Sequence, residues 1–334
     1  MKENKCLIIA EAGVNHNGSL DIALKLCDEA KKIGVDVVKF QTWKTENIIT
    51  KNVAQADYQT VNTGILESQF DMLKKLELSY DDFTVIKKHC DEIDIVFSST
   101  ADDEESLDFL VDLGIPFIKI GSGDIGNVPY LEHIGKKKMP IIMSTGMSSL
   151  SDVDISLRTL RDNGATDITL LHCTTNYPCP YEDVNLLAML TLKNAFHLPV
   201  GYSDHTIGNN VAVAAVAMGA SVIEKHFTLD CKMEGPDHAA STEPQAFHEF
   251  VQSIRQTEKA LGNGTKEPTS AEKEISKVVT KRIVASKPIK AGEKLNETNL
   301  CVKRNDSGEK ADQWKKLIGR TASKDYQCDE GINI

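Results

Sequence analysis

No C-x-x-C pair occurs in this chain, whose eight cysteines are scattered over 334 residues. Their spacing argues against a zinc ribbon and against a dithiol redox motif. No stretch is apolar over the length needed to cross a bilayer, and the early run LIIA is too short for the core of a signal peptide. Internal repeats and low-complexity tracts are also missing. We therefore expect a globular cytoplasmic protein in which several cysteines are reduced core residues.

An excess of positive charge is missing as well. The formal net charge is −11 at pH 7, which argues against nucleic acid or an anionic membrane as a partner. Hydrophobic residues make up 41% and charged residues 26%, both ordinary for a folded globular protein. The length suits one α/β barrel with a small appendage.

Eight short runs rich in valine and isoleucine recur through the first two-thirds of the chain. They are nearly continuous in apolar character, as expected for strands buried on both faces. Segments whose apolar residues recur at helical spacing separate these runs, and one more such segment follows the eighth run. Many of these segments start at a capping residue and stop at glycine. This alternation predicts a closed (β/α)8 TIM barrel over residues 1–264 rather than an open sheet. The strand-like runs are residues 6–10, 35–40, 93–99, 116–120, 140–144, 168–173, 198–203 and 221–227.

The character of the sequence changes after the predicted barrel. Residues 265–280 are polar and charged, which predicts a linker that is partly helical. In residues 281–334 short β-like runs alternate with turns such as KAGEK, which predicts a small, mostly-β domain. A domain of this size has little core of its own, so we expect it to need contact with something else.

Polar residues end or follow all eight strand-like runs. The active sites of such barrels lie at the carboxyl ends of the strands. One polar residue in such a place is usually a cap or a turn former, but capping does not explain all eight. The pattern predicts an enzyme. The residues are Glu11, Asn15, His16, Lys39, Gln41, Ser99, Thr100, Lys119, Ser122, Asp124, Ser144, Thr145, His172, Thr174, Thr175, His205 and His226.

His205 and His226 end two successive runs, with room between them for one helix and its turns. If these runs are neighbouring parallel strands, both imidazoles reach the same edge of the sheet. They would then be candidate ligands of one divalent metal ion, with further positions open to water or substrate. Ser203, Asp204 and Asp237 lie close by in the sequence and strengthen the prediction of a site.

Lys39, Lys119 and Lys225 interrupt otherwise apolar runs. Each could bury only its aliphatic stem and reach a solvated rim. If they are buried and converge, they predict a site for a phosphate or carboxylate, supported by serine hydroxyls and by backbone N–H groups at the turns GSGD and STGM.

Several motifs in order, AEAGVNHNGS, VVKFQ, KIGSGD, STGM, LLHCTTNYPCPYEDVNL, GYSDHT, EKHFTLD and GPDHAAS, resemble the sialic acid synthase family. The resemblance covers essentially the whole chain. Residues 281–334 are similar to the antifreeze-like (SAF) domain of that family, through AxxxIxxGExL at residues 285–295 and through Lys303-Arg304.

This resemblance implies a reaction and its partners. The family condenses phosphoenolpyruvate with an N-acetylmannosamine-type sugar and water, giving a nine-carbon nonulosonic acid and phosphate. It implies a divalent metal ion, Mn2+ with Mg2+ or Co2+ as alternatives, held by His205 and His226. It also implies a homodimer in which the SAF domain of one protomer reaches over the barrel of the other, so that Arg304 contacts the sugar's N-acetyl group.

By position, the resemblance assigns the substrate-binding residues. Glu11 or Asp124 would be the base that activates water. The phosphoenolpyruvate site would be Lys39, Lys119, Ser122, Ser144 and Ser203, with Thr100 and Thr175 at its edge, and the sugar site would be Glu11, Gln41, Tyr177 and Asp237.

Three departures from the family pattern matter: the first two bear on the sugar, and the third loosens the loop that carries Arg304. Asp124 replaces a usual glutamate, Ala101-Asp102 replaces Pro-Phe, and residues 305–308 lack the usual proline. The first hypothesis is N-acetylneuraminate synthesis, and the nearest alternative is N,N'-diacetyllegionaminate synthesis from 2,4-diacetamido-2,4,6-trideoxymannose. Two other classes stay open: a metal-dependent barrel aldolase, and a non-catalytic carbohydrate-binding or ice-binding protein.

Overall fold

The computed structural model describes residues 5–55 and 67–333. The chain forms two compact units, Met1–Gly262 and Asn263–Ile334. The division expected from the sequence, at residues 264 and 280, stays a prediction. In the described part of the chain, no helix is both long and apolar enough to cross a membrane.

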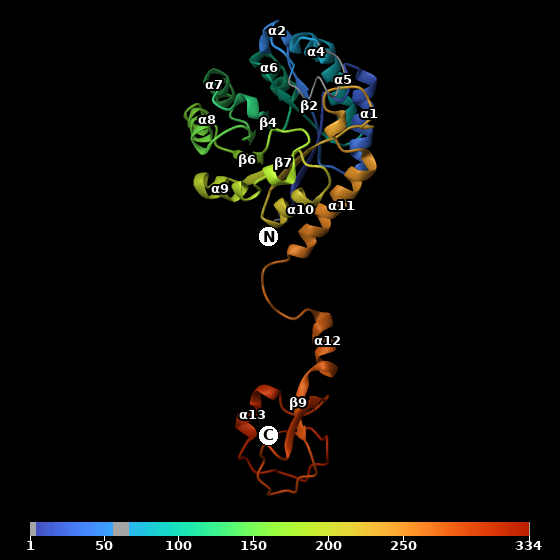
Figure 1. Ribbon diagram of the computed structural model, residues 1–334, viewed down its shortest axis with the longest axis vertical. Coiled ribbons are helices and arrows are strands. Elements are labelled where there is room, and N and C mark those ends of the chain that lie inside the picture. Colours follow the sequence, from blue (N-terminus) through green and yellow to red (C-terminus); the bar gives the residue numbers. More distant parts are fainter. Residues whose placement is uncertain (1–4, 56–66, 334) are drawn as a thin grey trace. The chain divides into compact units, whose positions relative to one another are not determined.

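The first unit is a closed barrel of eight parallel strands, β1 to β8 in sequence order, with β8 paired to β1 (Figure 1). All eight predicted strands are present, so the (β/α)8 fold is confirmed. The strands are β1 Leu7–Gly13, β2 Val37–Thr42, β3 Val96–Ala101, β4 Ile118–Ile120, β5 Ile141–Ser144, β6 Ile168–Cys173, β7 Val200–Asp204 and β8 Val222–His226.

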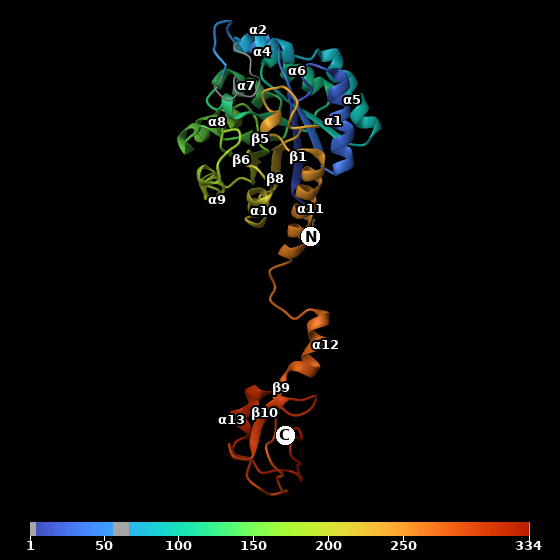
Figure 2. The same ribbon diagram turned by 45° about the vertical axis from the view of Figure 1, so that its right-hand side comes forward.

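Helices surround the strands on the outside (Figure 2). The helices of this unit are α1 Leu20–Ile33, α2 Thr45–Ile48, α4 Gln69–Leu76, α5 Tyr80–Glu92, α6 Glu104–Leu113, α7 Val128–Lys136, α8 Leu150–Asp162, α9 Leu187–Phe196, α10 Asn210–Ala217 and α11 Pro244–Leu261. A capping box at Ser79 starts α5 as a helix separate from α4.

Two hydrophobic layers hold the barrel together. The larger one packs the outer face of the strands against the helices. The smaller one fills the interior and is built from β-branched, leucine and phenylalanine side chains, as in other barrels of this type. Its buried members are Ile9, Val37, Phe117, Ile142, Leu171 and Val222.

The interior apolar layer determines where the polar layer lies. Side chains alternate between the two faces of a strand, so the residue two positions further on also faces the interior. Two residues beyond five of these apolar side chains, the chain has Glu11, Lys39, Lys119, Ser144 and Glu224. The sequence therefore places a charged layer directly above the apolar one, at the carboxyl ends of the strands.

The second unit contains α12 Ser270–Val279, β9 Lys281–Ala285, β10 Leu300–Arg304 and α13 Trp314–Leu317. Strands β9 and β10 pair antiparallel, and several isolated bridges extend the β character that the sequence predicts. Helix α12 lies in the stretch expected to be a partly helical linker. A small core of its own includes Ile283, Leu295, Leu317 and Tyr326.

Candidate active site

Two lysines and two glutamates occupy the interior of the barrel at the carboxyl ends of its strands. Lys39 from β2 and Lys119 from β4 are buried, at 2% and 4% exposure. Their ammonium nitrogens each lie 3.7 Å from a different carboxylate oxygen of Glu224 on β8. Both lysines thus converge, and the alternative that each reaches a solvated rim is wrong for them.

Hydroxyl groups complete this cluster. The ammonium group of Lys39 donates to Thr100 Oγ1 at 2.8 Å, and that of Lys119 donates to Ser144 Oγ at 2.7 Å. Ser203 Oγ donates to Glu224 Oε1 at 3.2 Å. The cluster gathers two ammonium groups and three hydroxyls around Glu224, and such donors are the chemistry that binds a phosphate or a carboxylate.

Glu11 and Glu224 differ sharply in protonation. Burial raises the pKa of Glu11 to about 7, although its contact with Lys39 opposes the rise. Burial also acts to raise the pKa of Glu224, but Lys119 and Lys39 outweigh it and hold that pKa at about 2. Glu224 is therefore a fixed anion, whereas Glu11 can exchange a proton near neutral pH, as a general acid or base must. Gln41 Nε2 donates to Glu11 Oε1 at 3.1 Å and fixes its orientation.

The histidine prediction is met in its geometry. Strands β7 and β8 are parallel neighbours, and the ring centroids of His205 and His226 lie 5.5 Å apart. The ring of Tyr177 lies 4.2 Å from that of His205 and 5.6 Å from that of His226. Asp237 Oδ2 lies 4.0 Å from His226 Nδ1, and burial raises the pKa of Asp237 to about 6.

These two imidazoles fit a divalent metal ion. His205 Nδ1 donates to the carbonyl of Thr174 at 2.7 Å, which leaves Nε2 as the free acceptor. His226 Nδ1 is buried without a hydrogen-bond partner, and burial lowers the pKa of this ring to about 3, so the ring is neutral at pH 7. Within residues 5–55 and 67–333, no group of three or more His, Cys, Asp or Glu side chains forms a complete metal cage. A metal held by two histidines keeps positions for substrate and water.

The loops after β4, β5 and β6 meet at one glycine. Gly146 N donates to Ser122 Oγ at 2.9 Å. A Cβ atom at Gly146 would lie 2.2 Å from Thr175 Oγ1 and 2.8 Å from Ser122 Oγ. Only glycine allows this approach, and it brings the predicted residues Ser122 and Thr175 together beside the lysine cluster.

Asp124 lies in the loop after β4, and Arg304 lies in the second compact unit. Asp124 ends the short helix η1 Ser122–Asp124 and accepts a hydrogen bond from Asn127 Nδ2 at 3.1 Å, and burial raises its pKa. Arg304 is exposed at the end of β10, in the second compact unit.

The expectation that Lys225 joins the anion site is wrong. Its neighbours Glu224 and His226 face the interior, so Lys225 faces the helices. There its ammonium group donates to Asp204 Oδ2 at 2.7 Å and lies 5.7 Å from the centre of the Phe250 ring. Sequence reasoning also missed Glu224, which the same alternation could have placed on the inner face once His226 was assigned there.

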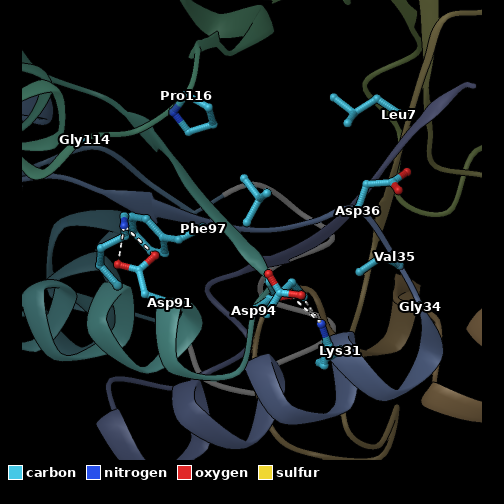
Figure 3. A pocket seen from close by; sticks show the side chains of 13 residues that line it. Leu7, Lys31, Gly34, Val35, Asp36, Asp91, Asp94, Phe97, Gly114 and Pro116 are labelled. Atoms are coloured by element: carbon cyan, nitrogen blue, oxygen red, sulfur yellow. Dashed lines mark hydrogen bonds and ion pairs between the residues drawn. The ribbon is translucent and has the colours of Figure 1, made fainter.

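A surface pocket lies at the other end of the barrel. It has a volume of about 610 Å3 and is lined by residues at the amino-terminal ends of strands, such as Leu7, Val35 and Pro116 (Figure 3). Its lysines are already engaged, Lys31 with Asp94 and Lys87 with Asp91. Conserved chemistry in these barrels belongs to the opposite end, so this pocket is not the candidate site.

The geometry is that of a barrel whose buried ammonium and hydroxyl donors suit an anionic substrate, beside two histidines that fit a divalent metal ion. A model of the NeuB family matches residues 26–266, and a model of the SAF domain matches residues 280–332. The N,N'-diacetyllegionaminic acid synthase of Campylobacter jejuni is 48% identical over 330 residues, which are 98% of this chain and 99% of that protein. Human N-acetylneuraminate-9-phosphate synthase is 36% identical over 302 residues, 90% of this chain and 84% of that protein.

Among solved structures, the N-acetylneuraminic acid (sialic acid) synthetase of Leptospira borgpetersenii, in complex with citrate, superposes with a TM-score of 0.73. It is 33% identical, and the match covers 82% of this chain and 90% of that one. The chain belongs to the NeuB family, with a C-terminal SAF domain. It is a phosphoenolpyruvate-dependent nonulosonic acid synthase, a kind of enzyme that generally uses a divalent metal ion and a hexosamine-type sugar.

Proposed function

We propose that this enzyme is an N,N'-diacetyllegionaminate synthase, which condenses phosphoenolpyruvate with 2,4-diacetamido-2,4,6-trideoxymannose and water. The observation that carries this choice is the 48% identity to the Campylobacter jejuni enzyme over 98% of the chain, against 36% to the human N-acetylneuraminate-9-phosphate synthase. The alternative of the sequence analysis is thus better supported than its first hypothesis. N-acetylneuraminate synthesis is the second candidate, favoured by the likeness to the Leptospira synthetase.

In this proposal Lys39 and Lys119 hold the phosphate and carboxylate of phosphoenolpyruvate, together with the hydroxyls of Ser122, Ser144 and Ser203. The support is that both lysines converge around Glu224 and are buried from solvent. Interactions between ammonium groups and anions are stronger there than in water. Fixing both substrates in reacting geometry lowers the barrier by removing the entropy cost of their encounter. Thr100 and Thr175 lie at the edge of this site.

In the proposed reaction C3 of phosphoenolpyruvate bonds to the aldehyde carbon of the sugar, which leaves C2 electrophilic. Glu11 is the proposed base that takes a proton from the water that then adds to C2, and the tetrahedral intermediate loses phosphate by C–O cleavage. Its pKa of about 7 suits this role better than the fixed anion Glu224. Gln41, Tyr177 and Asp237 are proposed to hold the sugar near His205 and His226. A divalent metal on these histidines, Mn2+ in our proposal, supplies Lewis acidity toward the aldehyde oxygen.

The deciding experiment measures phosphate release from phosphoenolpyruvate with Mn2+ and each of two sugars, 2,4-diacetamido-2,4,6-trideoxymannose and N-acetylmannosamine. We expect release with the first sugar, much less with the second, and none after chelation. Faster release with N-acetylmannosamine would support the second candidate instead. Release that resists chelation and survives in His226→Ala would contradict the metal role.

We also propose a homodimer in which Arg304 of one protomer completes the barrel site of the other, as the family resemblance implies. Mixing tests this directly. Glu11→Gln and Arg304→Ala variants are each expected to lose most of their activity. Co-refolded mixtures should regain activity because one site of the mixed dimer carries both residues. Active Arg304→Ala protein, or mixtures as inactive as either variant, would contradict the shared site.

A further inference from the structure

A buried ion pair lies directly behind the two histidines. Asp204 precedes His205 and Lys225 precedes His226, and the register of β7 and β8 sets Asp204 opposite Lys225. Their side chains are 0% and 3% exposed. Ser203 faces the interior, where it contacts Glu224, so Asp204 faces outward with Lys225.

One ammonium group contacts the residues on both sides of His205. Lys225 Nζ lies 2.7 Å from Asp204 Oδ2 and 2.7 Å from the carbonyl oxygen of Thr206. Asp204 Oδ1 in turn accepts from Thr206 N at 2.9 Å and from Thr206 Oγ1 at 2.7 Å. The residue before His226 therefore anchors the residues before and after His205.

We propose that Asp204 and Lys225 are positioning residues that set the separation of the two metal-binding imidazoles. The inference rests on the proposed role of His205 and His226 as metal ligands. An imidazole reaches its metal through only two side-chain torsions, so the positions of the two backbones decide whether both rings can bind one ion. Neither side chain of the pair faces the interior, so the pair acts on the metal only through the histidines.

The test uses the full-length chain and two variants. Lys225→Met alone would leave a buried carboxylate without a counter-charge, which is strongly destabilising. Asp204→Asn/Lys225→Met removes both charges, and the asparagine oxygen can still accept from Thr206. Asp204→Asn, the smallest change, is measured in parallel. The matched control is Arg255→Met, which breaks the 2.5 Å contact with Asp36 near the amino-terminal end of the barrel, away from the site.

The readouts are the affinity of the metal-free protein for Mn2+ by calorimetry and the visible absorption spectrum of the Co2+-loaded protein. We expect both variants to bind Mn2+ about tenfold to a hundredfold more weakly than the parent, the usual effect of losing a residue that orients a metal ligand. The Co2+ spectrum should change, and the KM for phosphoenolpyruvate should not. Arg255→Met should bind metal as the parent does.

Folded variants that bind Mn2+ as tightly as the parent, with an unchanged Co2+ spectrum, would overturn the inference. Metal binding that is lost in His205→Ala but kept in both ion-pair variants would overturn the inference and leave the proposed function intact. A parent chain that binds no metal would overturn both.

Discussion

Glu224 Oε1 lies 3.7 Å from Lys119 Nζ, across the interior of the barrel from β8 to β4. These strands stand opposite each other in the closed ring. The carboxylate thus bridges two sides of the barrel at the height where substrate is proposed to bind. It keeps a cationic pocket assembled, because two buried ammonium groups would otherwise repel each other.

Replacing this carboxylate should disorganise the pocket. In Glu224→Gln, Lys119 loses its counter-charge, and burial, which already lowers its pKa, acts with less opposition. We expect a loss of about 3 kcal/mol in the free energy of unfolding, and a KM for phosphoenolpyruvate raised about tenfold or more. Ser203→Ala is the control, because it removes only a hydrogen bond to the same carboxylate and should cost about 1 kcal/mol. If Glu224→Gln and Ser203→Ala lowered the free energy of unfolding and raised the KM equally, the bridging role of Glu224 would be contradicted.

Glu11→Gln tests the proposed base. We expect kcat to fall about 10²- to 10⁴-fold, the usual contribution of general acid–base catalysis. In the parent enzyme kcat should rise with pH through about 7, as the carboxyl group of Glu11 loses its proton. That rise should be missing from the variant's profile of kcat against pH. The kcat of Asp124→Asn is measured in parallel. A large loss of kcat in Asp124→Asn, with normal turnover in Glu11→Gln, would assign the base to Asp124.

Asp102 gives a prediction about stability and pH. Burial, and then the nearby Asp124, raise the pKa of Asp102 from 3.8 to about 7. Between these values the folded chain binds more protons than the unfolded chain, so the free energy of unfolding falls as pH rises from about 4 to about 7. Asp102 is partly exposed, which reduces the effect, and we expect Asp102→Asn to be more stable than the parent by about 2 kcal/mol at pH 8.

Urea unfolding at pH 4 and pH 8 checks this. The parent and Asp102→Asn should be nearly equal in stability at pH 4 and should differ at pH 8. Asp162→Asn, on the exposed end of α8, is the control and should leave the pH dependence unchanged. An equal gain for Asp102→Asn at both pH values would show that burial of its charge is not the cause.

Gly146→Ala tests the meeting of three loops. The new methyl group would lie 2.2 Å from Thr175 Oγ1, so the Thr175 side chain or the loops after β5 and β6 must move. We expect a stability loss of about 1–3 kcal/mol, as for other overpacked sites, and a higher KM for phosphoenolpyruvate. Gly121→Ala, where an added Cβ has no neighbour within 4 Å, should change neither. A KM that stays normal in Gly146→Ala would separate Ser122 and Thr175 from substrate binding.

The sequence by itself determined the barrel and the level at which its site lies. Continuous apolar runs separated by segments with helical spacing are compatible with few folds. The lysines and carboxylates stand near the carboxyl ends of their runs, which meet at one end of a barrel. His205 and His226 could be predicted to lie together because they end consecutive strands, which are neighbours in the barrel.

Only the tertiary structure decided which polar residues meet. Lys119 and Glu224 are distant in sequence, and their contact exists because closing the ring brings β4 and β8 face to face across the interior. Lys225 looked equivalent to Lys39 and Lys119 in the sequence, yet it faces the helices and pairs with Asp204. The apolar pattern of a strand that is buried on both faces does not by itself show which face is the inner one, so the role of a charge there depends on the partner that the fold supplies.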